Sequence, residues 1–328
     1  MTPSPGRTGQ TSVRDVVAST LRGDRDDPTT LYSYLGGGSL LADDTDYLNL
    51  GFWRDQPSSY REAGDALATE LVTFAGLKPL EPGKRRRKTL AIDVGFGFGE
   101  QDVLWARRFG LTLTGLNLTP PQIERAAERV RREGLEGRVS YLRANATSMP
   151  IGSGVAGLVL ALECAFHFHL REDFFREAFR VLKPGGVLAV ADLVTNSDLF
   201  GGTSPRSLGR RLVIEVGRRF WHIPAANLYG PDVYRSHLEA AGFAEVEIRS
   251  IGADTFPGIR SLMQAGQTLE RFPVHERPLV QLAGEAFAIP YQAGWIDYVL
   301  VRAIKPGRAA RSRTAQAPAI EPGSPSGS

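Results

Sequence analysis

Short apolar runs alternate with stretches whose apolar residues have helical spacing through the middle of the chain. Continuous apolar runs are typical of buried strands, and apolar residues at every third or fourth position are typical of amphipathic helices. Strands that alternate with helices indicate a parallel sheet covered on both faces. The expected strands are 89–94, 111–116, 139–142, 158–162 and 187–194, and the expected helices between them are 101–109, 120–133 and 171–182.

The pattern is less regular on both sides of this region. Before it, Ser59 and Glu62 have the spacing of a capping box, and apolar residues then recur at helical spacing as far as Gly76. After it, one apolar stripe predicts the helix of a cap inserted after the fifth strand, formed by Leu208, Leu212, Val216 and Phe220. Further helices are expected at 231–241, 258–272 and 276–287, and further strands at 244–251 and 295–303.

These patterns predict one elaborated domain between two disordered tails. The segments expected are a tail 1–28, an N-terminal helical lid 29–83, a ligand-binding core 84–194, a cap insertion 195–229, the rest of the core with an insertion 230–306, and a tail 307–328.

Composition adds few constraints to this picture. The 328 residues are 42% hydrophobic and 23% charged with a net charge of +3, which is ordinary for a soluble globular protein. The basic run 84–88 is best explained as a solvated turn, because no aromatic stacking residues or recognition fold accompany it, so no nucleic-acid partner is expected. A single cysteine and a polar N-terminus favour a cytoplasmic protein with no disulfide framework, signal peptide or membrane segment.

Three alternating glycines follow the first strand, in the sequence Asp-Val-Gly-Phe-Gly-Phe-Gly-Glu from Asp93 to Glu100. Glycine tolerates positive φ and brings backbone N–H groups close to a ligand. A dinucleotide fingerprint places its third glycine one residue later. The flanking Asp93 and Glu100 would repel a diphosphate but suit a ligand that carries ammonium and sulfonium charges.

This stretch resembles the first motif of the class I S-adenosylmethionine-dependent methyltransferases, and the resemblance extends from about residue 47 to about residue 306. It includes a Leu-Lys-Pro-Gly-Gly turn that ends at Gly186, before the fifth strand. The resemblance implies a Rossmann-like α/β fold with a seven-stranded, mostly parallel sheet and an antiparallel last strand, and S-adenosylmethionine as cofactor. The cofactor-binding residues that it suggests are Asp93, Gly95, Gly97, Gly99, Asn117, Leu118, Gln122, Asn145, Ala146 and Glu163.

Two of these positions differ from the usual family pattern. Asn117 stands where an acidic residue usually binds the ribose hydroxyls, and Asn145 stands where an aspartate usually holds the adenine amino group. Both amides can accept through their carbonyl oxygen. For Asn145, an Asx turn is the alternative explanation.

The resemblance also suggests residues that face the methyl acceptor. The aromatic segment, residues 47–53, is similar to one that covers the cofactor in many small-molecule methyltransferases, with Tyr47 and Trp53 as candidate contacts. His167 is the candidate general base, because the unperturbed pKa of histidine is about 6.5 and the residue follows the fourth strand. Sugar O-methyltransferases that the chain resembles have a His and an Asp at positions matching His167 and Asp192, and His169 is a rival base.

We therefore expect an enzyme that methylates a hydroxyl on a small, largely hydrophobic molecule of the natural-product or antibiotic type, at a rate that rises through a histidine-like pKa. A carbon or nitrogen methyltransferase, or a cyclopropane-forming relative, is an alternative within the family. A non-catalytic nucleoside-binding scaffold is an alternative of another class. The histidines have no metal-ligand spacing, so no metal is implied, and the oligomeric state stays open.

Overall fold

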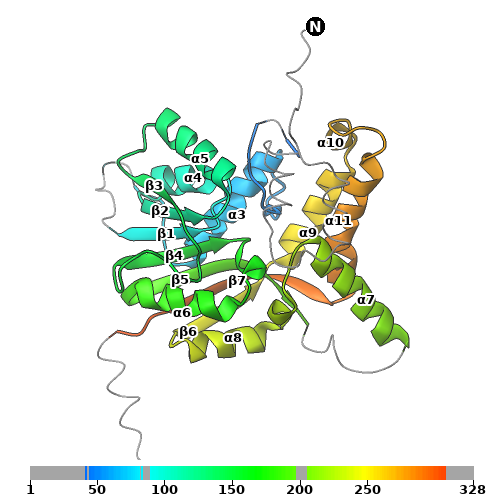
Figure 1. Ribbon diagram of the computed structural model, residues 1–328. Helices are drawn as coiled ribbons and strands as arrows, with labels where there is room; N and C mark the ends of the chain where they lie inside the picture. Colours follow the sequence, from blue (N-terminus) through cyan, green and yellow to red (C-terminus); the bar gives the residue numbers. More distant parts are fainter. Residues whose placement is uncertain (1–40, 43, 82, 84–88, 197–204, 308–328) are drawn as a thin grey trace, which may run out of the picture.

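The computed structural model describes residues 41–42, 44–81, 83, 89–196 and 205–307 (Figure 1). The basic run 84–88, the predicted tail 1–28 and the second predicted tail from residue 308 onward lie outside the described residues, as does the start of the predicted lid. No helix in the described part of the chain is long and apolar enough to cross a membrane.

A seven-stranded sheet with the order β3-β2-β1-β4-β5-β7-β6 forms the centre of the molecule. Strands β1 to β5 pair with one another in parallel, and β7 runs antiparallel to both β5 and β6. The expectation of a mostly parallel sheet with an antiparallel last strand is confirmed. The strands are β1 Leu90–Val94, β2 Thr112–Asn117, β3 Val139–Arg143, β4 Ala156–Leu162, β5 Leu182–Thr195, β6 Ala244–Ser250 and β7 Ile296–Ile304.

Helices cover both faces of this sheet (Figure 1). Strand β4 explains why the central strands read as continuous apolar runs, because its alternate side chains enter two different hydrophobic clusters. The cluster on one face is completed by α3 (Tyr60–Phe74), α4 (Glu100–Arg108) and α5 (Pro120–Arg132). The cluster on the other face is completed by α6 (Arg171–Val181) and α8 (Pro231–Ala240).

The helix that precedes the sheet begins as its sequence predicts. The Ser59 side chain caps α3 by accepting a hydrogen bond from the N–H of Glu62, and Gly76 follows the last turn with a left-handed φ of +89°. The Glu62 carboxylate accepts from the N–H and hydroxyl of Ser58 instead of Ser59, so the box closes one residue earlier than expected.

One helix between β6 and β7 starts earlier than its sequence suggested. The sequence pattern predicts a helix from residue 258 to residue 272, and a proline inside a helix removes a backbone hydrogen bond. The structure has α9 from Gly252 to Gln264 with Pro257 inside it, followed by the short α10 (Gly266–Leu269) and by α11 (Arg277–Gln292). Burial of Phe256 and Ile259 on one side of α9 outweighs the hydrogen bond that the proline removes.

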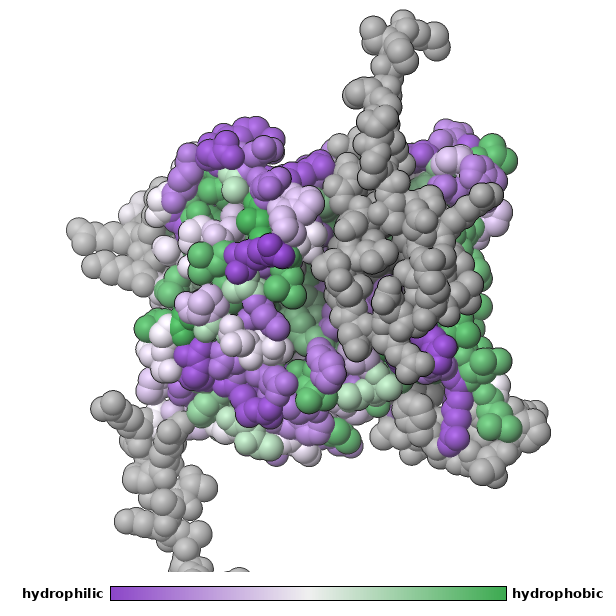
Figure 2. Space-filling model, viewed as in Figure 1, coloured by the Kyte–Doolittle hydropathy of each residue, from purple (hydrophilic) through white to green (hydrophobic). Residues whose placement is uncertain are grey.

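Helix α7 (Pro205–Phe220) is present where the cap was predicted, but it turns a different face inward. The predicted stripe Leu208, Leu212 and Val216 is exposed, whereas Ile214 is buried. Apolar side chains consequently lie on the surface along the edge formed by α7 and α11 (Figure 2). Helical spacing therefore identified this element without indicating which side of it packs.

Candidate active site

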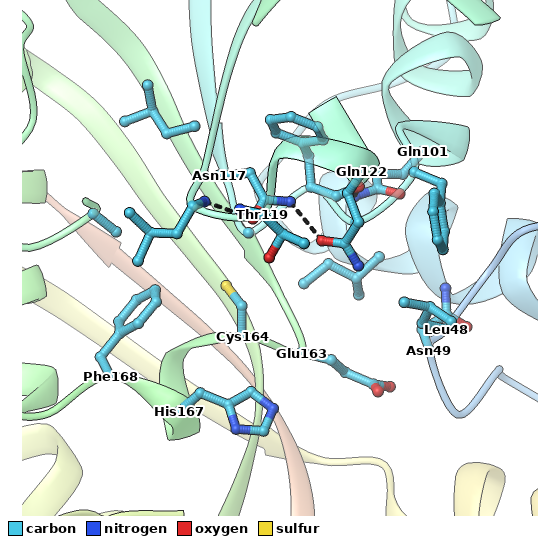
Figure 3. Close-up of a pocket in the computed structure, with 18 of the residues that line it drawn as sticks. Leu48, Asn49, Gln101, Asn117, Thr119, Gln122, Glu163, Cys164, His167 and Phe168 are labelled. Atoms are coloured by element: carbon cyan, nitrogen blue, oxygen red, sulfur yellow. Dashed lines mark hydrogen bonds between the residues drawn. The ribbon is translucent and has the colours of Figure 1, made fainter. Parts of the chain in front are cut away.

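A cavity of about 290 Å³ opens at the carboxyl ends of β1, β2 and β4 (Figure 3). Ligands of parallel α/β sheets bind at this edge. The structure brings many of the predicted site residues together in its wall: Tyr47, Gly95, Gly97, Asn117, Leu118, Gln122, Asn145, Ala146, Glu163, His167 and His169. Four other predicted residues do not line it: Trp53, Asp93, Gly99 and Asp192.

The three glycines after β1 have different roles. All have positive φ, which favours glycine at each of these positions. A Cβ on Gly95 would lie 2.5 Å from the Cβ of Cys164, and one on Gly99 would collide with the Tyr141 hydroxyl, so these two glycines allow close packing. A Cβ on Gly97 would meet nothing nearer than a Leu48 methyl at 4.0 Å. Gly97 is therefore the glycine whose missing side chain leaves room for a ligand.

Asp93 stabilises the glycine turn from a buried position outside the cavity. Its side chain is fully buried, and burial together with the neighbouring Asp102 raises its pKa. The Gln101 amide donates one hydrogen bond to Asp93 Oδ2 at 3.1 Å and another to the Phe96 carbonyl oxygen at 2.9 Å. Asp93 thus fixes the shape of the glycine turn through Gln101 without facing the cavity.

Near the end of β2, the amide group that is available to a ligand belongs to Gln122 and not to its neighbour Asn117. The Asn117 Oδ1 accepts from the N–H of Leu118 and Thr119, and its Nδ2 donates to Gln122 Oε1 at 2.9 Å. Gln122 is 3% exposed, lines the cavity and leaves its buried Nε2 without a hydrogen-bond partner. Because a buried amide is rarely left unpaired, Gln122 indicates a ligand acceptor beside it.

Asn145 forms the Asx turn that its sequence offered as an alternative. Its Oδ1 accepts from the N–H of Thr147 at 2.9 Å and from the Thr147 hydroxyl at 3.0 Å. The residue is exposed at the rim of the cavity, next to the buried Ala146. This turn shapes the rim of the cavity.

The aromatic segment, residues 47–53, forms the opposite wall and contains one site residue that the sequence reasoning missed. Asn49 lines the cavity, is 5% exposed and has an Nδ2 without a partner. Tyr47 also lines the cavity, and its hydroxyl donates to Asp65 at 2.7 Å. The Trp53 ring instead packs against Gly258 of α9. The Leu-Asn-Leu-Gly sequence, residues 48–51, was the signal that could have identified Asn49, but the prediction rested on the aromatic residues of the same segment.

Glu163 follows β4 in a left-handed conformation, with φ of +55°, which is uncommon for a residue with a side chain. Figure 3 shows its carboxylate extending toward the segment that carries Leu48 and Asn49. Its Oε1 accepts from the N–H of Leu50 at 2.8 Å and from the Tyr298 hydroxyl at 2.7 Å. Burial raises the pKa of Glu163 to about 7, against the opposing effect of these two hydrogen bonds.

His167 lies on the single 3₁₀ turn Ala165–His167 and lines the same cavity. Its Nδ1 is 3.4 Å from the carbonyl oxygen of His222, which favours the tautomer with the proton on Nδ1 and the acceptor on Nε2. Burial lowers the pKa of His167 to about 3. The expectation of a pKa near 6.5 is wrong for this structure, and the ring is neutral at any ordinary pH. His169 also borders the cavity, but its side chain is exposed.

Asp192 has partners that explain its burial without a ligand. It is fully buried, and its Oδ2 is 3.0 Å from Arg171 Nε and 3.0 Å from the hydroxyl of Tyr234. Its Oδ1 accepts from the N–H of Leu193. The structure therefore places Asp192 and His167 in different environments, with Asp192 holding the buried guanidinium of Arg171.

The sequence and the fold both match known methyltransferases. The family model described as a methyltransferase domain matches residues 92–190. Erythromycin 3''-O-methyltransferase of Saccharopolyspora erythraea is 35% identical over 65% of this chain and 68% of its own, and methyltransferase GfsG of Streptomyces halstedii is 31% identical over 80% and 88%. Among solved structures, geranyl diphosphate C-methyltransferase of Streptomyces coelicolor aligns with a TM-score of 0.59 at 21% identity, covering 74% of this chain and 79% of its own.

The fold and these relatives define the class of protein: the chain belongs to the methyltransferases with a Rossmann-like domain. It is an S-adenosylmethionine-dependent methyltransferase, as its glycine turn suggested. The site fits that cofactor. Gly97 leaves open space beside its backbone for the cofactor, and Gln122 and Asn49 each have a buried amide nitrogen without a hydrogen-bond partner. The acidic Glu163 complements a positively charged donor.

Replacing Gly97 with valine should reduce the affinity for S-adenosylmethionine at least a hundredfold, because a branched side chain fills the space beneath the ligand. Gly134→Val is the matched control, since Gly134 has a similar φ of +64° and open space around it, and lies outside the cavity. Both variants should lose comparable stability, and calorimetric titration should show lost binding for Gly97→Val alone. Equal affinities in the two variants would exclude this role for Gly97.

The affinity for S-adenosylmethionine should also rise as the pH passes through about 7, because Glu163 is neutral below its pKa and negatively charged above it. A positive ligand favours the charged form, so the dissociation constant should fall up to about tenfold from pH 6 to pH 8. Glu163→Gln keeps the shape and the hydrogen-bond acceptor but should bind more weakly with no such dependence. The same pH profile in both proteins would contradict the assignment.

Proposed function

We propose that the enzyme methylates a hydroxyl group on a hydrophobic natural-product-like molecule, with His167 as the group that receives the hydroxyl proton. The supporting observation is that one cavity contains both the open glycine Gly97 and the neutral ring of His167. The name of the relative from Saccharopolyspora erythraea, an erythromycin O-methyltransferase, favours oxygen as the acceptor atom.

The cofactor supplies an electrophilic methyl group carried by a positively charged sulfur. The residues of this chain supply alignment and exclusion of water. The aromatic segment and the turns after β1 and β4 enclose the cavity from opposite sides, which holds two reactants in one orientation. Alignment of this kind accounts for up to roughly 7–11 kcal/mol in well-oriented intramolecular reactions.

We propose that Gln122 and Asn117 hold the nucleoside end of the donor, and Asn49 and Glu163 its amino-acid end. The unpaired Nε2 of Gln122 suits a ribose oxygen, and the unpaired Nδ2 of Asn49 suits a carboxylate. The Glu163 carboxylate suits the ammonium group. This arrangement extends the donor along the edge of the sheet from β2 toward β4 and leaves the acceptor on the His167 side.

His167 does not need a high pKa for its role. An alcohol oxygen gains positive charge as it bonds to carbon, and its proton then becomes a far stronger acid than in the free alcohol. A neutral imidazole with a pKa of about 3 can receive that proton, provided that Nε2 is within hydrogen-bond distance of the hydroxyl. The hydrogen bond from Nδ1 to the His222 carbonyl oxygen keeps the ring in this orientation.

The proposal is tested by methylation of a panel of acceptors that differ in one hydroxyl, beginning with erythromycin that lacks its 3''-O-methyl group. Methyl transfer from labelled S-adenosylmethionine to an oxygen of a panel member would support it. Transfer to carbon or nitrogen alone would instead support the alternative reaction types.

His167→Ala should lower kcat by about 10²- to 10⁴-fold with little effect on donor affinity, because His167 contacts the acceptor and not the donor. His169→Ala is the control and should stay within about threefold of the wild type, since that side chain is exposed. The wild-type kcat should be flat from about pH 5 upward, because His167 stays neutral there. Activity lost in His169→Ala but kept in His167→Ala would move the role by two residues, and full activity in both would leave alignment as the mechanism.

A further inference from the structure

A second, smaller cavity of about 60 Å³ lies at the carboxyl end of β5. Its wall is formed by the last residues of β5 together with α7, α11 and the loop after α7. The residues that matter for its chemistry are Thr195, Ile214, Gly217, Trp221, Ile223 and Phe287. Most of these side chains are apolar, so the cavity favours an apolar group.

The two charged residues in the wall, Arg171 and Arg218, are already neutralised. Arg218 pairs with Glu215 and donates to the carbonyl oxygen of Ile223 at 3.1 Å. Arg171 pairs with Asp192, donates to the carbonyl oxygens of Leu193 at 2.7 Å and Asn227 at 2.8 Å, and lies over the Tyr229 ring. A guanidinium that is paired in this way has little capacity for a further anion. The cavity therefore does not select a charged ligand.

Thr195 gives the cavity an unpaired polar group. It is 5% exposed, lines the cavity, and its buried Oγ1 has no hydrogen-bond partner among the described residues. Buried hydroxyl groups are normally paired. An unpaired hydroxyl in an apolar wall is what a ligand oxygen would satisfy.

The two cavities are neighbours along one edge of the sheet. Strands β4 and β5 pair side by side, and β4 leads into the first cavity whereas β5 ends in the second. His167 lines the first cavity and contacts the carbonyl oxygen of His222, and the residues on either side of His222, Trp221 and Ile223, line the second. A ligand seated in the second cavity would therefore lie close to His167.

We propose that the second cavity is the subsite that selects the acceptor, taking an uncharged, branched or alicyclic part of it with one hydroxyl or carbonyl oxygen beside Thr195. This inference rests on the proposed function, because it assigns the first cavity to the donor. A cavity needs about 10–15 Å³ to hold one water, so 60 Å³ accommodates a group of about four to six heavy atoms. That size matches a branched alkyl group or the edge of a ring.

The experiment uses two small probes of the same shape, tert-butanol and the tert-butylammonium ion. Trp221 reports binding, because it lines the cavity and its ring stacks on Phe287 at 4.6 Å. Its indole N–H resonance is assigned by comparison with Trp221→Phe and followed during titration. tert-Butanol should shift this resonance saturably, whereas tert-butylammonium should bind at least fivefold more weakly. Thr195→Val should weaken tert-butanol binding about five- to tenfold, through the lost hydrogen bond.

Two glycines of α7 provide a matched pair of variants. Gly217 lines the cavity and Gly209 does not, and a Cβ at either position meets no atom within 4 Å. Gly217→Leu should abolish the saturable shift, and Gly209→Leu should preserve it. No saturable shift in the wild type, equal binding of the two probes, or equal losses in both leucine variants would overturn the proposal.

Turnover separates this inference from the proposed function. With any acceptor that the wild type methylates, Gly217→Leu should raise the KM for that acceptor at least tenfold without changing the KM for S-adenosylmethionine, and Gly209→Leu should change neither. Methylation that Gly217→Leu leaves unaffected would overturn the subsite and leave the proposed function intact. Saturable tert-butanol binding without O-methylation of any panel member would overturn the proposed function and, with it, the acceptor role of the cavity.

Discussion

The close approach of β1 and β4 at their carboxyl ends is the constraint on which the site depends. The space that a Cβ of Gly95 would occupy is taken by Cys164, whose Sγ lies 3.0 Å from the carbonyl oxygen of Val94. This contact holds the glycine turn after β1 close to the residues that follow β4. Glu163 and His167 consequently lie in the same wall as Gly97, although some 70 residues separate them in the chain. A larger residue at position 95 would collide with Cys164, so the ends of the two strands would have to move apart.

Charged contacts fix the other wall. Asp46, just before the aromatic segment, pairs with Arg125 and Arg129 of α5, and Glu100 of α4 pairs with Arg129 and accepts from the N–H of Asp46. Each charge has an opposite partner within reach, so this network is neutralised despite its partial burial. The hydrogen bond from Leu50 to Glu163 then joins the segment to the end of β4. The cavity is thereby closed by a part of the chain that belongs to neither strand.

The sequence predicted the features that depend on local pattern. Apolar runs identified the strands because central parallel strands are buried on both faces, and Thr119, Pro120 and Gly134 marked the ends of α5. The glycine turn was recognisable because its spacing is local.

Features that depend on contacts between distant residues were less accessible. The pairing of Asp192 with Arg171, the burial that lowers the pKa of His167, and the unpaired amide of Asn49 all arise from tertiary packing. The exposed stripe of α7 shows the same limit, since a repeat of apolar residues does not reveal which side meets the core. Helix α9 likewise contains Pro257 in its interior, where buried neighbours compensate for the missing backbone hydrogen bond.

The position of the bound donor determines the role of every residue in the cavity wall, and a crystal structure of the complex with S-adenosylhomocysteine measures it. We predict that the ligand occupies the cavity at the carboxyl ends of β1, β2 and β4. Its ribose should lie within hydrogen-bond distance of Gln122 or Asn117, and its amino-acid end beside Asn49 and Glu163. A ligand found elsewhere on the molecule, or none at saturating concentration, would contradict the account.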